Sequence, residues 1–288
     1  MNKINEYSLI RRMALRHARD AFRSQSFIDE HWEKLNYHER PDFSRAVDEY
    51  DAMVEIFRNQ NIELHFLPAD ETLSMDGIYV RDATLVSPGG LIACRMGKDA
   101  RMVEPPIAQA HYTSLDFSIL GAIEAPGSIE GGDLIWLDER TCAIARGYRT
   151  NDEGGAMLSR LLGPDVEVIT VALPHYKGPS DVFHLMSIIS PLDKDLMLVY
   201  SPLMPVPFRE LLLKRGYSLV EVPDEEFESM ACNVLALAPR RCLVVDGNPI
   251  TRKRLEAAGC EVIVYEGAEI SRKGEGGPTC LTRPLERA

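Results

Sequence analysis

The sequence predicts an α/β fold in which five similar units close into a ring, a five-bladed α/β propeller. One observation is a repeat, because five segments of the 288-residue chain share one layout and recur about every fifty residues. A second is that the last copy is cut short, while the N-terminal region contains the elements that it lacks. Self-similarity at such a period is typical of repeat and propeller architectures. A third is that each segment opens on a side chain able to do chemistry, namely Asp82, Asp133, His184, Asn233 and Cys280.

Each complete unit is predicted to run strand, turn, strand, helix and strand. Short apolar runs on both sides of "DER", "PLDKD" or "PRR" predict hairpins, and the periodicity of the next stretch predicts a helix. Gly216 and Gly259 close two of these helices, as C-terminal glycines commonly do. In the second unit the predicted strand, strand, helix and strand cover residues 134–137, 142–146, 152–163 and 166–173. In the third unit they cover residues 186–190, 196–200, 207–216 and 217–223. In the fourth unit they cover residues 234–238, 242–246, 249–259 and 260–266.

The first and last units need separate treatment. Between the first two complete units, the segment 101–117 combines paired prolines with mixed polarity and is considered as a lid. The last unit stops after "CLTRPLER", and the N-terminal region supplies an apolar run at 7–15, a helix near 43–60 and a strand at 62–68. We therefore expect the two ends of the chain to complete one unit together, which closes the ring and leaves no open sheet edges.

Composition predicts one domain over residues 1–288 and excludes several partners. No linker or low-complexity tract divides the chain, and 45% hydrophobic residues can form a sizeable core. The net charge of −12 argues against nucleic acid and anionic membranes and favours a cation. We see neither the apolar core of a signal peptide nor the roughly 20 apolar residues of a transmembrane helix. Six cysteines without a CxxC pair favour reduced thiols and a cytoplasmic protein. The oligomeric state stays open, with a homodimer among the states considered.

If the units surround an axis, their opening side chains converge in one pocket. Cys280 follows the flexible "GEGGP" and is predicted to be a nucleophile, although a lone cysteine is more often inert packing. His184 stands at the equivalent position two units earlier. Alone it would be a hydrogen-bonded core residue, but its register with the cysteine predicts an acid–base partner with a pKa near neutral pH.

Three carboxylates, Asp82, Glu130 and Asp133, are predicted at the tips of two further units. Acidic residues beside glycines usually form solvated turns, but three in a closed pocket indicate a metal ion or a cationic substrate. One histidine and one cysteine do not complete a coherent ligand set with them, so we expect no metal. Carboxylates accept paired N–H donors from a planar cation, and guanidinium is such a cation. The sequence therefore predicts a small guanidino substrate and no cofactor.

On these residues the chain resembles the guanidine-modifying hydrolases and amidinotransferases of the pentein fold. It is most similar to the branch containing dimethylarginine dimethylaminohydrolase and arginine deiminase. The resemblance runs over nearly the whole chain, from "EYSLIRRMALRHARDAF" to "GGPTCLTRPL". Each motif alone is a weak signal, and their common order and spacing are a strong one. The motifs are "RD" at Arg81–Asp82, "EGGD" at Glu130–Asp133, "RTN" at Arg149–Asn151, "HL" at His184–Leu185 and "GGPTCLTRP" around Cys280.

The resemblance implies covalent catalysis at a guanidinium carbon. Cys280 would attack this carbon and form a thiouronium. His184 would protonate the departing amine and later deprotonate water. Glu130 would orient the histidine, and Asp82 would bind guanidinium nitrogens.

Other roles follow from the same resemblance. Arg149 matches the family arginine that binds the α-carboxylate of the substrate, and Arg101 is a second candidate for that task. The alternative for both is a surface ion pair of little consequence. Asp133 would add negative charge to the pocket or hold a loop, and Asn233 would satisfy backbone groups at the end of its strand.

Met186 departs from the arginine deiminase pattern, which has an aspartate two residues after the histidine. Dimethylarginine hydrolases are more similar at this place, and an apolar residue suits an N-alkylated guanidine. The expected reaction is therefore hydrolysis of N-methylated arginine to citrulline and an alkylamine. Three alternatives remain: an arginine deiminase, an amidinotransferase using the same cysteine and histidine, and a non-catalytic binding protein of this fold.

Overall fold

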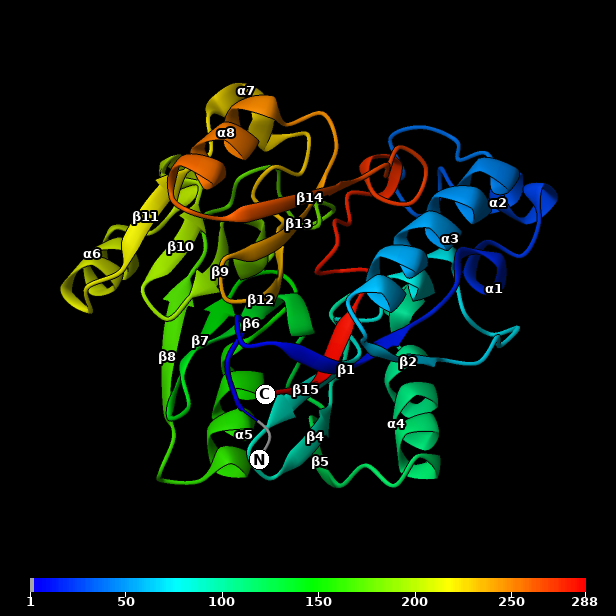
Figure 1. Ribbon diagram of the computed structural model, residues 1–288. Coiled ribbons are helices and arrows are strands. Elements are labelled where there is room, and N and C mark those ends of the chain that lie inside the picture. Colours follow the sequence, from blue (N-terminus) through cyan, green and yellow to red (C-terminus); the bar gives the residue numbers. More distant parts are fainter. Residues whose placement is uncertain (1–2) are drawn as a thin grey trace.

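The computed structural model describes residues 3–288 and contains five three-stranded sheets, which form the blades of a propeller (Figure 1). The predicted fold class is therefore confirmed. The blades consist of β15 (Arg283–Arg287), β1 (Ile10–Leu15) and β2 (Glu63–Phe66); β3 (Thr84–Ser87), β4 (Gly90–Ala93) and β5 (Ile119–Ala122); β6 (Leu134–Asp138), β7 (Thr141–Arg146) and β8 (Glu167–Ala172); β9 (Ile189–Asp193), β10 (Leu196–Val199) and β11 (Ser218–Glu221); and β12 (Leu235–Ala238), β13 (Arg241–Val245) and β14 (Glu261–Tyr265).

Every blade has the same internal order. Its first two strands are antiparallel and its last two are parallel, so a helix carries the chain back between them. Gly216 and Gly259 follow two of these helices with φ of 85° and 83°, a left-handed backbone that glycine adopts without strain. The crossover helices are α3 (Phe43–Asn59), α4 (Glu104–Ser114), α5 (Asp152–Leu162), α6 (Val206–Lys214) and α8 (Pro249–Ala257), and the shorter ones are α1 (Ala18–Phe22), α2 (Gln25–His31) and α7 (Asp224–Phe227).

The two ends of the chain complete one blade, as predicted. β15 pairs antiparallel with β1, and β1 pairs parallel with β2. Lys3 N donates to Arg287 O, and Ala288 N donates to Leu9 O, both at 2.9 Å. The C-terminus therefore lies beside the start of the described chain (Figure 1), and backbone pairing between the two ends completes the closing blade.

Three predicted segments differ in the structure. The strand predicted at 186–190 begins only at Ile189, because Leu185–Ser187 form a 3-10 helix. The turn predicted at 191–195 is shorter, because β9 continues to Asp193, which pairs with Leu196. The segment 101–117, considered as a lid, contains α4, the crossover helix of the first blade, and its Tyr112 is fully buried. This segment is thus part of a blade. None of the helices within residues 3–288 is long and apolar enough to cross a membrane.

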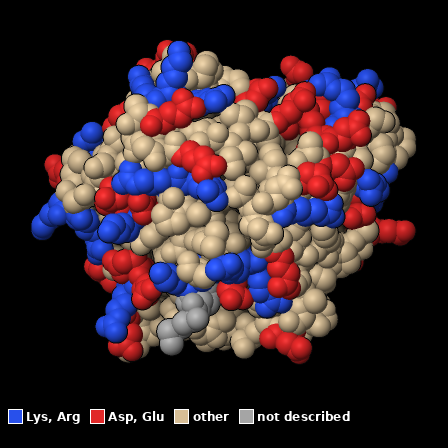
Figure 2. Space-filling model, in the orientation of Figure 1, with Lys and Arg blue, Asp and Glu red and all other residues tan. Residues whose placement is uncertain are grey.

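Buried apolar side chains join neighbouring blades. In one cluster, Ile135 of the second blade packs with Ile189 and Leu198 of the third and Val244 of the fourth. Such packing fixes the strand ends, where the loops that carry the repeat-opening residues meet the sheets. On the face shown in Figure 2, basic and acidic side chains are interspersed, so this face has no continuous basic area for a polyanion.

Candidate active site

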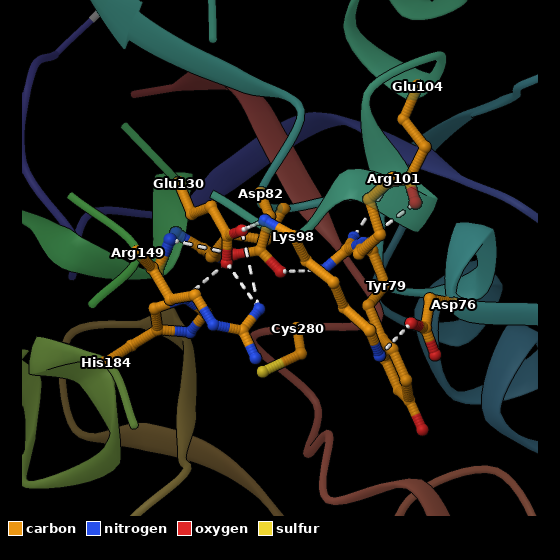
Figure 3. A network of polar contacts seen from close by, with 12 residues as sticks. Asp76, Tyr79, Asp82, Lys98, Arg101, Glu104, Glu130, Arg149, His184 and Cys280 are labelled. Carbon is orange, nitrogen blue, oxygen red and sulfur yellow. Dashed lines mark hydrogen bonds and ion pairs between the residues drawn. The ribbon is translucent and has the colours of Figure 1, made fainter. Parts of the chain in front are cut away.

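Four of the five side chains that open the repeats line one cavity. Its volume is about 770 Å³ including the open mouth, and its wall contains Asp82, His184, Asn233 and Cys280. Each of the four lies just before the first strand of a different blade. In Figure 3, Asp82, His184 and Cys280 face a common space. The convergence expected from the repeat is therefore present for these four residues.

Cys280 differs from the other five cysteines, which are all buried, because it is partly exposed. Asn233 Nδ2 donates to its Sγ at 3.2 Å, and Asn233 Oδ1 accepts from Thr279 N at 3.0 Å and Oγ1 at 2.7 Å. Burial and the charge of Asp82 raise the pKa of the Cys280 thiol, while the contacts from Asn233 and Thr279 oppose that rise. The sequence analysis missed the contact between Asn233 and the sulfur. The position of Asn233 at a repeat opening was the signal for it.

His184 is held by a carboxylate. Its Nε2 lies 2.7 Å from Oε2 of Glu130, and both side chains are buried. Burial alone lowers the pKa of a histidine, but the charges of Asp133, Asp82 and Glu130 outweigh burial and raise the pKa of His184 to about 9. The imidazole is therefore protonated at neutral pH and can donate a proton. Its Nδ1 faces Gly132, where an added Cβ atom would lie 2.7 Å away.

Glu130 has backbone partners as well as the histidine. Its Oε1 accepts from Gly97 N at 2.9 Å and Lys98 N at 3.1 Å, and Arg149 Nη1 lies 3.3 Å from Oε2. Burial raises the pKa of a carboxyl group, but the hydrogen bond and charge of His184 and the charge of Arg149 hold the pKa of Glu130 well below its usual range. Glu130 therefore stays ionised and stabilises the imidazolium.

Asp82 is held by Arg101, which lines the same cavity. Its Oδ2 accepts from Arg101 Nη1 at 2.7 Å, and its Oδ1 accepts from Gly132 N at 2.9 Å. Each oxygen has further acceptor capacity, so Asp82 can still bind a planar cation in the cavity. Arg101 also binds both oxygens of Glu104, at 2.7 and 2.8 Å, and Tyr79 O at 2.8 Å. Protein groups thus occupy the Arg101 guanidinium that was expected to face a substrate carboxylate.

Asp133 and Arg149, also predicted to bind substrate, lie outside the wall of this cavity. Asp133 accepts from Leu185 N at 3.0 Å and holds the backbone after the histidine. Burial raises the pKa of Asp133. Arg149 lines a neighbouring cavity, where it donates to Asp181 O at 3.3 Å and contacts Glu130. Asp133 therefore holds the backbone beside the site, while Arg149 lies in an adjoining cavity that shares Tyr79 and Glu275 with the first one.

A metal ion fits the donor set poorly. Asp82, Glu130 and His184 each offer one ligand atom, and these atoms lie within 4.8 Å of one another. A histidine must be neutral to bind a metal, whereas His184 is held protonated with its Nε2 against Glu130. The three groups are arranged to hold a proton.

Most of the mouth of the cavity comes from residues 176–183 and Glu228, which the sequence analysis did not single out, while Glu275 belongs to the "GEGGP" before Cys280. Lys177 Nζ binds Glu228 Oε2 at 2.6 Å. Asp181 and Glu275 line the same opening, and burial together with the charge of Glu275 raises the pKa of Asp181. Aromatic rings line the same cavity, including that of Phe183. The mouth therefore offers both signs of charge beside apolar surface, which suits a zwitterion with an alkyl stem.

The five-bladed fold, together with a cysteine, a carboxylate-held histidine and a second carboxylate in one cavity, defines a guanidine-modifying enzyme of the pentein superfamily. Residues 19–287 match the family "N,N dimethylarginine dimethylhydrolase, eukaryotic". The chain belongs to this family, and it is a hydrolase of the kind that acts on the C–N bonds of amidines.

Individual relatives agree with this assignment. The N(G),N(G)-dimethylarginine dimethylaminohydrolase of Pseudomonas aeruginosa is 26% identical over 247 residues, which are 84% of this chain and 89% of that protein. A solved structure of a mutant of that organism's enzyme, complexed with citrulline, has a TM-score of 0.77 at 23% identity over 95% and 98% of the two chains. An amidinotransferase of saxitoxin biosynthesis from Microseira wollei has a TM-score of 0.81 at 16% identity over 99% and 97%. The two solved structures share the fold with this chain.

Proposed function

We propose that the protein hydrolyses an N-alkylated arginine to citrulline and an alkylamine, with Cys280 as the nucleophile. The observation that carries this proposal is that Cys280, His184 and Asp82 line one cavity, with His184 against Glu130. The chain would act as a single domain, residues 1–288. Side chains supply the nucleophile and the proton donor, so the reaction needs no cofactor.

Asp82 would receive the guanidinium through two parallel N–H···O contacts. Met186, Phe183 and Phe227 add apolar wall to the same cavity. An unsubstituted guanidinium nitrogen that faces an apolar wall loses hydrogen bonds it had in water, whereas an N-alkyl group loses none. This difference favours an alkylated substrate.

In the first half-reaction, the Cys280 sulfur attacks the central guanidinium carbon. The substrate cation opposes the burial that raises the thiol pKa, Asn233 stabilises the sulfur as a thiolate, and the thiol proton passes to solvent. The new C–S bond gives a tetrahedral adduct. The C–N bond to the alkylated nitrogen then breaks as His184 protonates that nitrogen, and the amine leaves. A thiouronium remains on Cys280.

In the second half-reaction, water takes the place of the amine. His184, now neutral, removes one proton from the water as its oxygen bonds to the thiouronium carbon. The adduct then loses its remaining hydroxyl proton to solvent as the C–S bond breaks, so that the Cys280 thiolate is regenerated and the neutral ureido product is released. The ionised Glu130 stabilises the imidazolium each time it forms.

The amino-acid end of the substrate would lie at the mouth. Its ammonium would pair with Asp181 and Glu275, and its carboxylate would displace Glu228 from Lys177. Arg149 would act indirectly, by holding the Asp181 backbone, which it contacts at 3.3 Å. Arg101 and Asp133 would likewise be positioning residues.

The test is product formation from asymmetric dimethylarginine and, in parallel, from arginine. We expect citrulline and dimethylamine in equal amounts from the methylated substrate, with loss of activity in Cys280→Ser and retention in Cys260→Ser. Citrulline from arginine alone would instead indicate an arginine deiminase. Amidine transfer to an added amine without citrulline would indicate an amidinotransferase. The absence of any product would refute the substrate assignment.

A further inference from the structure

A second cavity, of about 370 Å³ including its open mouth, shares no lining residue with the first. Four cationic residues and two carboxylates line it, so its wall has a formal excess of two positive charges within a chain of net charge −12. The cationic residues are Lys3, Arg81, Arg283 and Arg287, and the carboxylates are Glu6 and Glu286.

Two of these arginines are buried with donors that have no partner. Arg81 is 1% exposed and Arg283 is 4% exposed. Within residues 3–288, Arg81 Nη2 and Arg283 Nε have no hydrogen-bond acceptor. Glu6 Oε2 lies 3.4 Å from Arg81 Nη1. Buried charged donors are normally paired, because leaving them unpaired costs more than leaving a neutral group unpaired.

The electrostatics of the cavity also indicate that its buried arginines lack a negative partner. Burial and the charge of Arg81 lower the pKa of Arg283 to about 10, and Glu6 opposes this only in part. A guanidinium whose pKa falls in this way lacks a sufficient counter-charge. A bound anion would supply that counter-charge.

We propose that this cavity binds a small oxyanion of the phosphate, sulfate or carboxylate type between Arg81 and Arg283. The planar guanidinium fork matches the oxygens of such anions. Arg81 belongs to the "RD" pair whose other member, Asp82, serves the first cavity. Arg81 N donates to Cys280 O at 3.2 Å, and its Nε donates to Thr279 O at 2.7 Å. An anion held by Arg81 therefore fixes the loop that carries Cys280.

The test uses inorganic phosphate, sulfate and acetate as probes, each titrated calorimetrically into the full chain at constant ionic strength. We expect saturable binding of one anion per chain, unchanged by saturating citrulline in the first cavity, and a rise in Tm with phosphate concentration. The anion with the lowest Kd identifies the preferred class. No saturable binding of any of the three, or competition with citrulline, would overturn the proposal.

Three variants locate the site. Arg283→Gln removes a ligand and should weaken binding at least tenfold. Glu6→Gln removes the competing carboxylate and should strengthen binding about tenfold, because it leaves Arg81 without its counter-charge. Arg160→Gln, in the exposed part of α5, is the control and should bind as the unaltered chain does. Unchanged affinity in Glu6→Gln would contradict the proposal even if Arg283→Gln does not fold.

Discussion

The ionisation of His184 controls the proposed chemistry at the scale of single residues. Its pKa is raised to about 9, so as the pH rises through 9 the imidazolium is lost and with it the proton donor. We therefore predict that kcat/KM falls above about pH 9. Because the pKa of His184 is higher in the folded state than its value of about 6.5 in the unfolded state, protonation of His184 stabilises the fold. This contribution to the free energy of unfolding is complete below about pH 6.5 and is lost as the pH rises through 9.

Glu130→Gln tests the origin of this pKa. The variant keeps the shape of the side chain but loses the charge and the strong hydrogen bond, so the pKa of His184 should fall by at least about one unit. NMR of the histidine ring nitrogens measures it directly. An unchanged titration of His184 would mean that Asp82 and Asp133 alone hold the proton.

Gly132 provides a steric test of the same imidazole. A Cβ atom at this position would lie 2.7 Å from Nδ1 of His184 and 3.0 Å from Oδ1 of Asp82, so Gly132→Ala should displace the histidine. Because a displacement of about 1 Å can cost about 100-fold in rate, we expect kcat to fall by that order. Gly155→Ala is the matched control, since nothing lies within 4 Å of its added methyl group. The control should gain roughly 0.5–1 kcal/mol of stability in α5 and keep full activity. A Gly132→Ala enzyme with unaltered kcat would refute the placement of His184.

The sequence predicts the position of a site residue correctly where that position follows from the repeat. Cys280, His184 and Asp82 could be brought together because each opens a unit and equivalent loops meet. Asp133 also opens a unit, yet its carboxylate turns to Leu185 N. Spacing cannot predict that direction, because it depends on the local backbone and on a neighbour 52 residues away.

At the scale of elements, the segment before His184 forms the mouth and is expected to select the amino-acid end of the substrate. Lys177→Met removes the lysine proposed to bind the carboxylate, so KM for an amino-acid guanidine should rise about tenfold with little change in kcat, as for loss of uniform binding. A guanidine without a carboxylate should show no change in KM. Lys214→Met, at the exposed end of α6, is the control. Equal effects on both substrates would argue against this role.

Element order was predictable and some element boundaries were not. The strand–strand–helix–strand order follows from apolar runs, turns and helix-closing glycines. The segment 101–117 was considered as a lid because of its paired prolines and mixed polarity, yet it contains a crossover helix. Proline is tolerated in the first turn of a helix, and Pro105 and Pro106 lie in the first turn of α4.

At the scale of the whole molecule, ring closure by the chain ends predicts tolerance of circular permutation. A chain that joins residue 288 to residue 1 by a short flexible linker and opens between Pro88 and Gly89, in the exposed β3–β4 turn, preserves every blade. We expect this permutant to keep its activity and to lose only a few degrees of Tm. Deletion of residues 283–288 should instead prevent folding, because it removes β15 from the closing blade. Failure of the permutant to fold would show that the order of the blades along the chain is essential.

The pairing of β1 with β15 also decides how the molecule responds to a pulling force. Ile10 lies opposite Arg287, and Ala14 lies opposite Arg283, so the two strands run in opposite directions from the same end of the pair. A load applied to the two chain ends would therefore break the hydrogen bonds between these strands one after another. It would not load all of them at once in shear. The propeller would open at this seam under a small force, while the other four blades, whose strands are joined within the chain, remain folded.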